Sequence, residues 1–134
     1  MKKNRIFEEV VEMLSKKYEF VSREEKCTIY GQAYGEFCRV KCSIPVGKYD
    51  FPLGIVVDHS YRSDMVSYHV GEYNSGYPVS DFDDKDYIRL INLVTGLPID
   101  KCADMVQLVQ DEMEQVATDL EEYMDELIEG CKCM

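Results

Sequence analysis

The chain opens with apolar positions at helical spacing. They recur every three or four residues, and charged residues lie between them. The apolar members of this run are Ile6, Phe7, Val10, Val11 and Leu14. Asn4 precedes the run and can accept a hydrogen bond from a backbone N–H of the first turn. We therefore predict an amphipathic helix over residues 5–17.

From Cys27 the period of the apolar positions changes to two residues, which is typical of strands. We predict a strand over residues 27–34, a turn near Tyr34-Gly35, and a second strand with one dry face. The dry face comprises Cys38, Val40, Cys42 and Ile44. Pro45 and Gly47 are expected to end this strand.

Two further strands follow from short apolar runs. A loop is predicted over residues 49–52, and Leu53 to Asp58 is a continuous apolar run that indicates a central strand. Residues 65–70 form a fourth candidate strand. The segment 71–80 is rich in Gly, Tyr, Asn and Ser, so we expect a surface loop there.

The C-terminal part of the chain predicts two helices. Ser80 to Asp84 supplies capping and acidic residues for the first, and Gly96 can end it. Asp100 can cap the second, which is expected to run to about Glu129, a length of roughly 45 Å at 1.5 Å per residue. The short turn between them resembles that of a DNA-reading helix-turn-helix. The second helix, however, would meet DNA with Asp100, Asp104 and only Lys101, where arginine, lysine or amides are needed, so a helical hairpin docked on the sheet is the better interpretation.

These elements predict an α+β fold. It consists of an N-terminal helix, a mostly antiparallel sheet of about four strands, and a C-terminal helical hairpin with a long acidic amphipathic last helix. We expect one α+β domain over residues 1–134, with residues 130–134 as a flexible tail.

The last helix carries a heptad-like apolar seam. Its members alternate steps of four and three residues over nearly four heptads, as in coiled coils. They are Cys102, Val106, Val109, Met113, Val116, Leu120, Tyr123 and Leu127. Gln110, Ala117 and Met124 form a second stripe beside the seam, which widens the apolar face towards ordinary globular packing.

The negative charge of the chain is concentrated in the last predicted helix. The net charge of the chain is -11, and residues 102–131 hold ten acidic residues and no basic one, leaving 16 acidic and 15 basic residues elsewhere. Nine of the ten are the candidate partner-binding residues, which we call the C-terminal acids. They are Asp111, Glu112, Glu114, Asp119, Glu121, Glu122, Asp125, Glu126 and Glu129.

The C-terminal acids predict a basic protein partner. Like charges three or four residues apart on a helix repel by a few tenths of a kcal/mol per pair, and no lysine is interleaved to offset them. The alternative to partner binding is that these carboxylates only face solvent on the outer side of the helix. Direct binding to nucleic acid or to an anionic membrane through this surface is not expected, because phosphates would be repelled.

Three functions stay open on the sequence. The first is a non-catalytic inhibitor that covers a basic, nucleic-acid-binding surface of a partner, for example a mobile-element anti-CRISPR or anti-restriction protein that mimics nucleic acid. The second is a dimeric scaffold or chaperone that pairs the last helix with its copy. The third is a cysteine- or metal-dependent enzyme that uses Cys131, Cys133 or a core thiol with His59 or His69.

No catalytic, cofactor or metal site is predicted. Cys38 and Cys42 would lie roughly 13 Å apart on a strand, too far to share a zinc ion. Cys131 and Cys133 are better spaced, but no second pair accompanies them. Loop tyrosines, namely Tyr49, Tyr61, Tyr73 and Tyr77, are candidate contact residues.

The N-terminus lacks the apolar core of a signal peptide, because Glu8 and Glu9 interrupt its apolar positions. No apolar run approaches the roughly 20 residues that span a bilayer. We therefore expect a cytoplasmic protein with reduced thiols.

Overall fold

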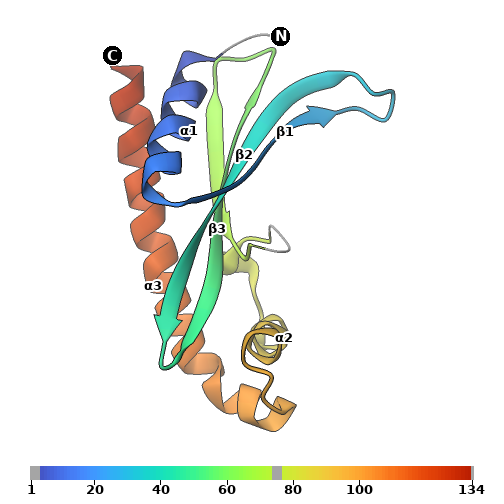
Figure 1. The fold of residues 1–134 in the computed structure, drawn as a ribbon, viewed down its shortest axis with the longest axis vertical. Helices are drawn as coiled ribbons and strands as arrows, with labels where there is room; N and C mark the ends of the chain where they lie inside the picture. Colours follow the sequence, from blue (N-terminus) through green and yellow to red (C-terminus); the bar gives the residue numbers. More distant parts are fainter. Residues whose placement is uncertain (1–3, 74–76, 134) are drawn as a thin grey trace.

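The computed structural model describes residues 4–73 and 77–133 and has the predicted fold class (Figure 1). An N-terminal helix precedes a four-stranded antiparallel sheet, and two helices follow it. The elements are α1 (Arg5–Lys17), β1 (Glu19–Cys27), β2 (Ala33–Val46), β3 (Tyr49–Ser60), β4 (Val66–Gly71), the 3-10 helix η1 (Val79–Asp81), α2 (Asp84–Thr95) and α3 (Ile99–Lys132).

The sheet is a meander in the order β1-β2-β3-β4, and each strand is antiparallel to the next. The predicted loop over residues 49–52 is wrong, because β3 already begins at Tyr49. Pro45 and Pro52 are tolerated because β1 pairs with β2 only as far as Lys41, and β4 pairs with β3 only from Gly54. Each proline is therefore paired on one side only, within the β2–β3 ladder, and has no strand on its other side that needs its missing N–H.

The first predicted strand is also wrong. Residues 27–34 alternate in sequence, but the structure places β1 at Glu19–Cys27 and a turn over residues 28–32. Gly31 has a positive φ of 79°, which suits this turn. Because β1 is an edge strand with polar side chains on both faces, it lacks the alternation that reveals a strand.

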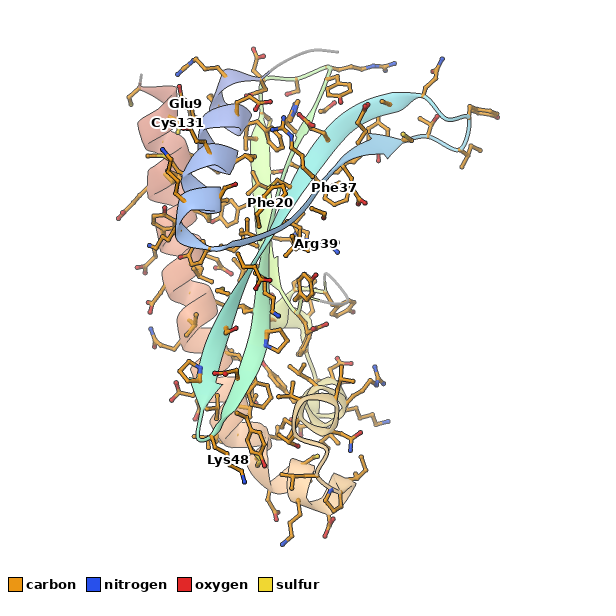
Figure 2. All side chains as sticks on the ribbon, viewed as in Figure 1. Glu9, Phe20, Phe37, Arg39, Lys48 and Cys131 are labelled. Atoms are coloured by element: carbon orange, nitrogen blue, oxygen red, sulfur yellow. The ribbon has the colours of Figure 1, made fainter. Side chains whose placement is uncertain are left out.

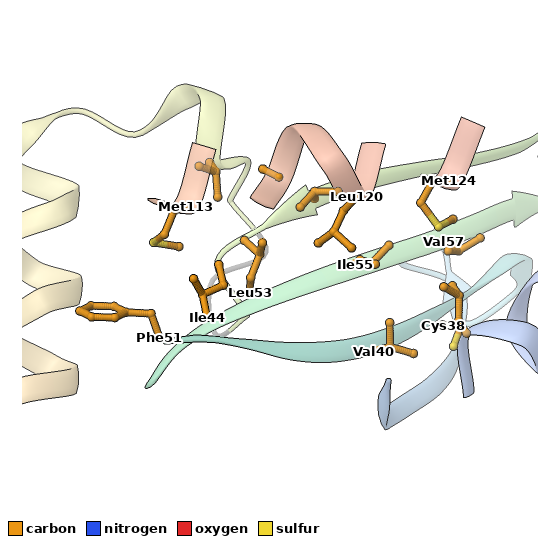
Figure 3. Close-up of a cluster of buried hydrophobic side chains, with 14 of the residues drawn as sticks. Cys38, Val40, Ile44, Phe51, Leu53, Ile55, Val57, Met113, Leu120 and Met124 are labelled. Carbon is orange, nitrogen blue, oxygen red and sulfur yellow. The ribbon is translucent and has the colours of Figure 1, made fainter. Parts of the chain in front are cut away.

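The core lies between one face of the sheet and the helices α1 and α3, which run side by side (Figure 1). The predicted dry face of β2 is confirmed for Cys38, Val40 and Ile44, whereas Cys42 is only partly buried. Figure 3 shows this face together with that of β3 under the side chains of α3. The labelled side chains of β3 and α3 are Phe51, Leu53, Ile55, Val57, Met113, Leu120 and Met124.

The C-terminal hairpin forms as predicted, with α2 packed on α3. Asp83 caps α2 in a capping box with Asp86, and Gly96 ends it in the left-handed conformation with φ 71°. The predicted surface loop over residues 71–80 includes residues 74–76, which lie outside the described part of the chain.

Helix α3 differs from its predicted bounds at both ends. Pro98, and not Asp100, is the N-cap, and Asp100 lies in the first turn. The helix continues through Gly130 to Lys132, so it includes residues 130–132 of the segment that the sequence predicts to be a flexible tail. Cys131 is only 2% exposed, and its burial explains why the last turn stays helical.

The buried face of α3 also departs from the heptad seam. Val106, Val116, Tyr123 and Leu127 are only partly buried, while Ala117, Met124 and Ile128 are buried. A straight helix drifts by about 20° per heptad relative to a seven-residue repeat. Since α3 packs on the sheet and on both α1 and α2, and not along a single partner helix as in a coiled coil, its contact face follows this drift.

Within residues 4–73 and 77–133, no helix combines the length and the apolar character needed to cross a lipid bilayer.

Candidate functional site

The C-terminal acids lie on the side of α3 that faces away from the sheet. All nine are exposed, while the residues that interleave with them, such as Met113, Leu120 and Met124, are buried in the core. The packing of α3 therefore holds the carboxylates outward on a rigid helix. The structure brings together every residue of the predicted partner-binding set.

Few of these carboxylates have a cation beside them. Across the described residues, the only ion pair of a C-terminal acid joins Glu129 to Lys132, at 3.3 Å. Asp125 accepts a hydrogen bond from the hydroxyl of Tyr68 on β4, at 2.6 Å. Burial and this carboxylate raise the pKa of Tyr68. The surface is thus strongly anionic, and one tyrosine ties its flank to the sheet.

Glutamine side chains one turn before the acids partly offset the repulsion between the C-terminal acids. This feature was not predicted from the sequence. Each glutamine donates a side-chain hydrogen bond to the carboxylate four residues later, which stabilises a helix modestly. The pairs are Gln107–Asp111 at 2.8 Å, Gln110–Glu114 at 3.1 Å and Gln115–Asp119 at 3.1 Å. Amides supply these bonds without cancelling charge, so the face keeps its full negative charge.

A second charged group, absent from the sequence reading, joins α1 to three strands. We call Glu8, Arg23, Glu36 and His59 the charged cluster. Arg23 donates from Nε to Glu36 at 3.1 Å and from Nη2 to the other Glu36 oxygen at 2.7 Å. Its Nη1 donates to Glu8 at 2.9 Å, and its Nη2 also contacts Glu8. One guanidinium therefore holds two carboxylates from different elements.

Burial makes the charged cluster an interior feature. Glu36 is 7% exposed and His59 is 2% exposed, and His59 Nε2 lies 3.3 Å from Glu36 Oε1. The His59 ring packs against Phe7 at a tilt of 52°, with ring centroids 4.3 Å apart. The hydrogen bonds from Arg23 hold the pKa of Glu36 below its usual value. This arrangement joins α1 to the sheet through one buried carboxylate and one shared guanidinium.

The core thiols are poor nucleophiles. Burial raises the pKa of Cys38 and of Cys42 to about 11, and Cys42 Sγ donates to the carbonyl of Leu53 at 3.1 Å. Cys38 lies on the same face as the charged cluster, but His59 contacts Glu36 and not a thiol. The pairing of a core cysteine with His59 as a catalytic dyad gains no geometric support.

Cys131 and Cys133 do not face the same way. Side chains two residues apart on a helix point about 200° apart, and Cys131 is buried while Cys133 is exposed. Figure 2 shows Cys131 beside Glu9 between α1 and α3. Burial and the Glu9 carboxylate raise the pKa of Cys131. In the described part of the chain, no three His, Cys, Asp or Glu side chains converge as metal ligands do.

The predicted loop tyrosines are mostly engaged. Tyr49 lies in β3 and not in a loop, and Tyr61 donates to Glu25 at 3.2 Å. The ammonium of Lys41 lies 5.4 Å from the ring centre of Tyr73. Tyr77 is half exposed. The most exposed tyrosine is Tyr30, which sequence alternation placed in a strand.

Thiol reactivity tests this description of the cysteines. We expect Cys27 and Cys133 to react rapidly with 5,5′-dithiobis(2-nitrobenzoic acid) at pH 8, because both are exposed. Cys38, Cys42, Cys102 and Cys131 should react at least about tenfold more slowly unless the protein is unfolded. Stopped-flow absorbance with the C27S/C133S variant as control measures this. A fast phase that survives in the control would contradict the assignment.

Comparison with protein-family models, with curated proteins and with solved structures finds no match to this chain.

Proposed function

We propose that this chain is a non-catalytic, acidic protein-binding protein. The observation that carries the proposal is the set of nine exposed carboxylates on the outer side of α3, of which one has a basic side chain within 4 Å among the described residues. Such a surface attracts a basic protein at long range and speeds its association. The partner is therefore a protein with a basic surface.

The function that fits this chemistry best is inhibition of a nucleic-acid-binding protein. A basic groove that binds phosphates also accepts carboxylates held in a row. Glu112, Asp119 and Glu126 form one such row, with about 10.5 Å between successive members along the axis. A mobile-element inhibitor of the anti-CRISPR or anti-restriction type is the concrete form of this proposal.

The other two functions have less support. Pairing of α3 with a second copy would need the apolar seam, but Cys102, Val109 and Met113 are already covered within one chain. An enzyme using a core thiol would need a thiolate, and burial raises the pKa of Cys38 and Cys42 to about 11. Protein binding through the acids needs no rearrangement of the core.

Charge neutralisation tests the proposal. The partner recovered from the native host with the wild-type chain is purified, and its Kd is measured for the wild type and for E112Q/D119N/E122Q/E126Q. We expect the variant to bind about tenfold more weakly at 50 mM salt, and the difference to shrink at 500 mM salt because salt screens exposed charges. The free energy of unfolding should stay equal or rise slightly, since repulsion along α3 is relieved.

A matched control removes the same charge elsewhere. Glu19, Glu24, Asp50 and Asp81 are exposed and lie outside α3. The E19Q/E24Q/D50N/D81N variant changes the net charge equally, so it should bind as the wild type does. If both variants bind the partner equally more weakly than the wild type, the effect comes from net charge and not from the C-terminal acids. If E112Q/D119N/E122Q/E126Q binds as the wild type does, the proposal is wrong.

A further inference from the structure

The tip of the β1–β2 hairpin exposes two large apolar side chains. We call residues 28–32 the hairpin tip. Within it, Ile29 is 94% exposed and Tyr30 is 86% exposed, more than any other large hydrophobic residue in the described part of the chain. As neighbours, they form a contiguous exposed apolar patch, and the largest such patch on a protein is often functional.

The hairpin tip stands clear of the rest of the fold. Strand β3 accompanies β2 only as far as the pair Gly35 and Ser60, whereas β1 and β2 continue to the pair Cys27 and Ala33. The hairpin therefore extends beyond the sheet as a two-stranded arm (Figure 1). A Cβ on Gly35 would overlap the backbone carbonyl oxygen of His59, so this close approach anchors the base of the arm.

The hairpin tip is internally ordered despite its exposure. The amide of Gly31 donates to the carbonyl of Thr28 at 3.0 Å, and the amide of Thr28 donates to the carbonyl of Gln32 at 2.9 Å. The Thr28 hydroxyl accepts from the amide of Tyr30 at 3.2 Å. Ile29 and Tyr30 are thus presented at the centre of a rigid turn, which lowers the entropy lost on binding.

The hairpin tip is also free of charge. Residues 27–35 contain no Asp, Glu, Lys or Arg, although charged residues make up 31% of the chain. Charged side chains would have to be desolvated in an apolar pocket, at high cost. This segment is therefore chemically suited to enter such a pocket, unlike the acidic helix face.

We propose that the hairpin tip is an apolar anchor, with Ile29 and Tyr30 inserted into an uncharged pocket beside the basic surface of a protein partner. This inference rests on the proposed function, namely that the chain binds a protein. It adds a second contact of a different chemistry. The tip and the C-terminal end of α3 lie toward the same end of the long axis of the molecule but on opposite sides of it in this view, so a partner that contacts both must extend across that end (Figure 1).

Area and charge favour a protein partner over a second copy or a membrane. Ile29 and Tyr30 offer on the order of 300 Å² together, whereas a stable interface buries about 800 Å² per partner. Two tips alone would not hold a dimer, and two copies of net charge -11 repel. One short apolar tip also gives only weak membrane binding. A basic protein supplies the missing area and the attraction.

Paired substitutions test the anchor. The protein that co-purifies with the wild-type chain from the native host is purified, and its Kd is measured for I29S/Y30S and for the control M13S/L93S, which removes exposed apolar side chains elsewhere. We expect I29S/Y30S to weaken binding at least about tenfold and the control by less than about twofold. Circular dichroism and thermal melts confirm that both variants fold.

Salt dependence separates the two contacts. The loss caused by I29S/Y30S should be the same at 50 and 500 mM salt, because an apolar contact is not screened, while the loss caused by neutralising the C-terminal acids should shrink. If I29S/Y30S weakens binding and neutralising the C-terminal acids does not, the anchor is supported and the proposed function is overturned. If neutralising the C-terminal acids weakens binding and I29S/Y30S does not, or if no partner is recovered, the anchor is overturned.

Two further measurements test whether the hairpin tip contacts a second copy of the chain or a lipid surface instead of a protein partner. Sedimentation velocity up to 200 µM measures self-association, and flotation with phosphatidylcholine vesicles measures membrane binding. We expect a monomer and no flotation. Dimers or flotation that are lost in I29S/Y30S would overturn the protein anchor in favour of a second copy or of a lipid surface.

Discussion

The substitution Arg23→Met is expected to lower the free energy of unfolding by about 3 kcal/mol. The change removes the guanidinium and leaves Glu36, only 7% exposed, beside the Glu8 carboxylate and without its hydrogen bonds from Arg23, so that only the contact with His59 at 3.3 Å remains. The cost lies at the low end for a broken interior ion pair because the Arg23 side chain is 31% exposed. Urea denaturation followed by circular dichroism measures it.

The pH dependence of the same variant identifies the cause. Arg23 lowers the pKa of Glu36 in the folded protein, so this stabilisation is present above the unfolded pKa of about 4.3 and is lost as the pH falls through the folded value. The difference between wild type and Arg23→Met should therefore be largest near pH 7 and shrink below about pH 4. Arg62→Met, at an exposed arginine, serves as control and should change stability little.

The double variant Arg23→Met/Glu36→Gln removes the unpaired charge as well. It should regain part of the lost stability, since a neutral amide is less costly to bury than a carboxylate. A pH-independent loss in the single variant, together with no recovery in the double variant, would show that packing and not charge carries the effect.

The substitution Met113→Ala is expected to destabilise the fold by about 3 kcal/mol. Met113 is completely buried between α3 and the sheet, and its removal leaves a cavity that the surrounding side chains fill only in part. The matched control is Leu108→Ala, in the same helix but 53% exposed, which should change stability by less than about 0.5 kcal/mol. Thermal and urea unfolding of both variants measure the difference.

This comparison also tests the orientation of the C-terminal acids. If α3 were rotated so that the acids faced the sheet, Leu108 would be buried in place of Met113, and the two variants would exchange their effects. Destabilisation by Leu108→Ala alone would therefore contradict the outward placement on which the proposed function depends.

Local patterns predicted the helices well because their residues carry the information in sequence order. The periodic apolar positions of residues 5–17 and the capping pair Asp83 and Gly96 lie within a few residues of the elements they define. The strands were predicted less well. β1 has no dry face to produce a period, and the alternation of residues 27–34 belongs mainly to a turn.

The two candidate sites also differ in how well the sequence predicts them. The C-terminal acids could be found from the sequence because they share one helix, and their exposure follows from the burial of the residues between them. The charged cluster could not be found, because Glu8, Arg23, Glu36 and His59 come from four elements and meet only when the sheet forms. A lone arginine in a polar strand carries no local signal of its partners.

The amino-acid sequence by itself determined the α+β class, the long amphipathic last helix and the segregation of charge onto it, since these depend on the order and spacing of neighbouring residues. Only the tertiary structure decided which alternating segment is strand and which is turn. It likewise decided that α3 uses its apolar face within one chain and that Ile29 and Tyr30 stand in water. These outcomes depend on pairing and burial between distant segments, which no local pattern encodes.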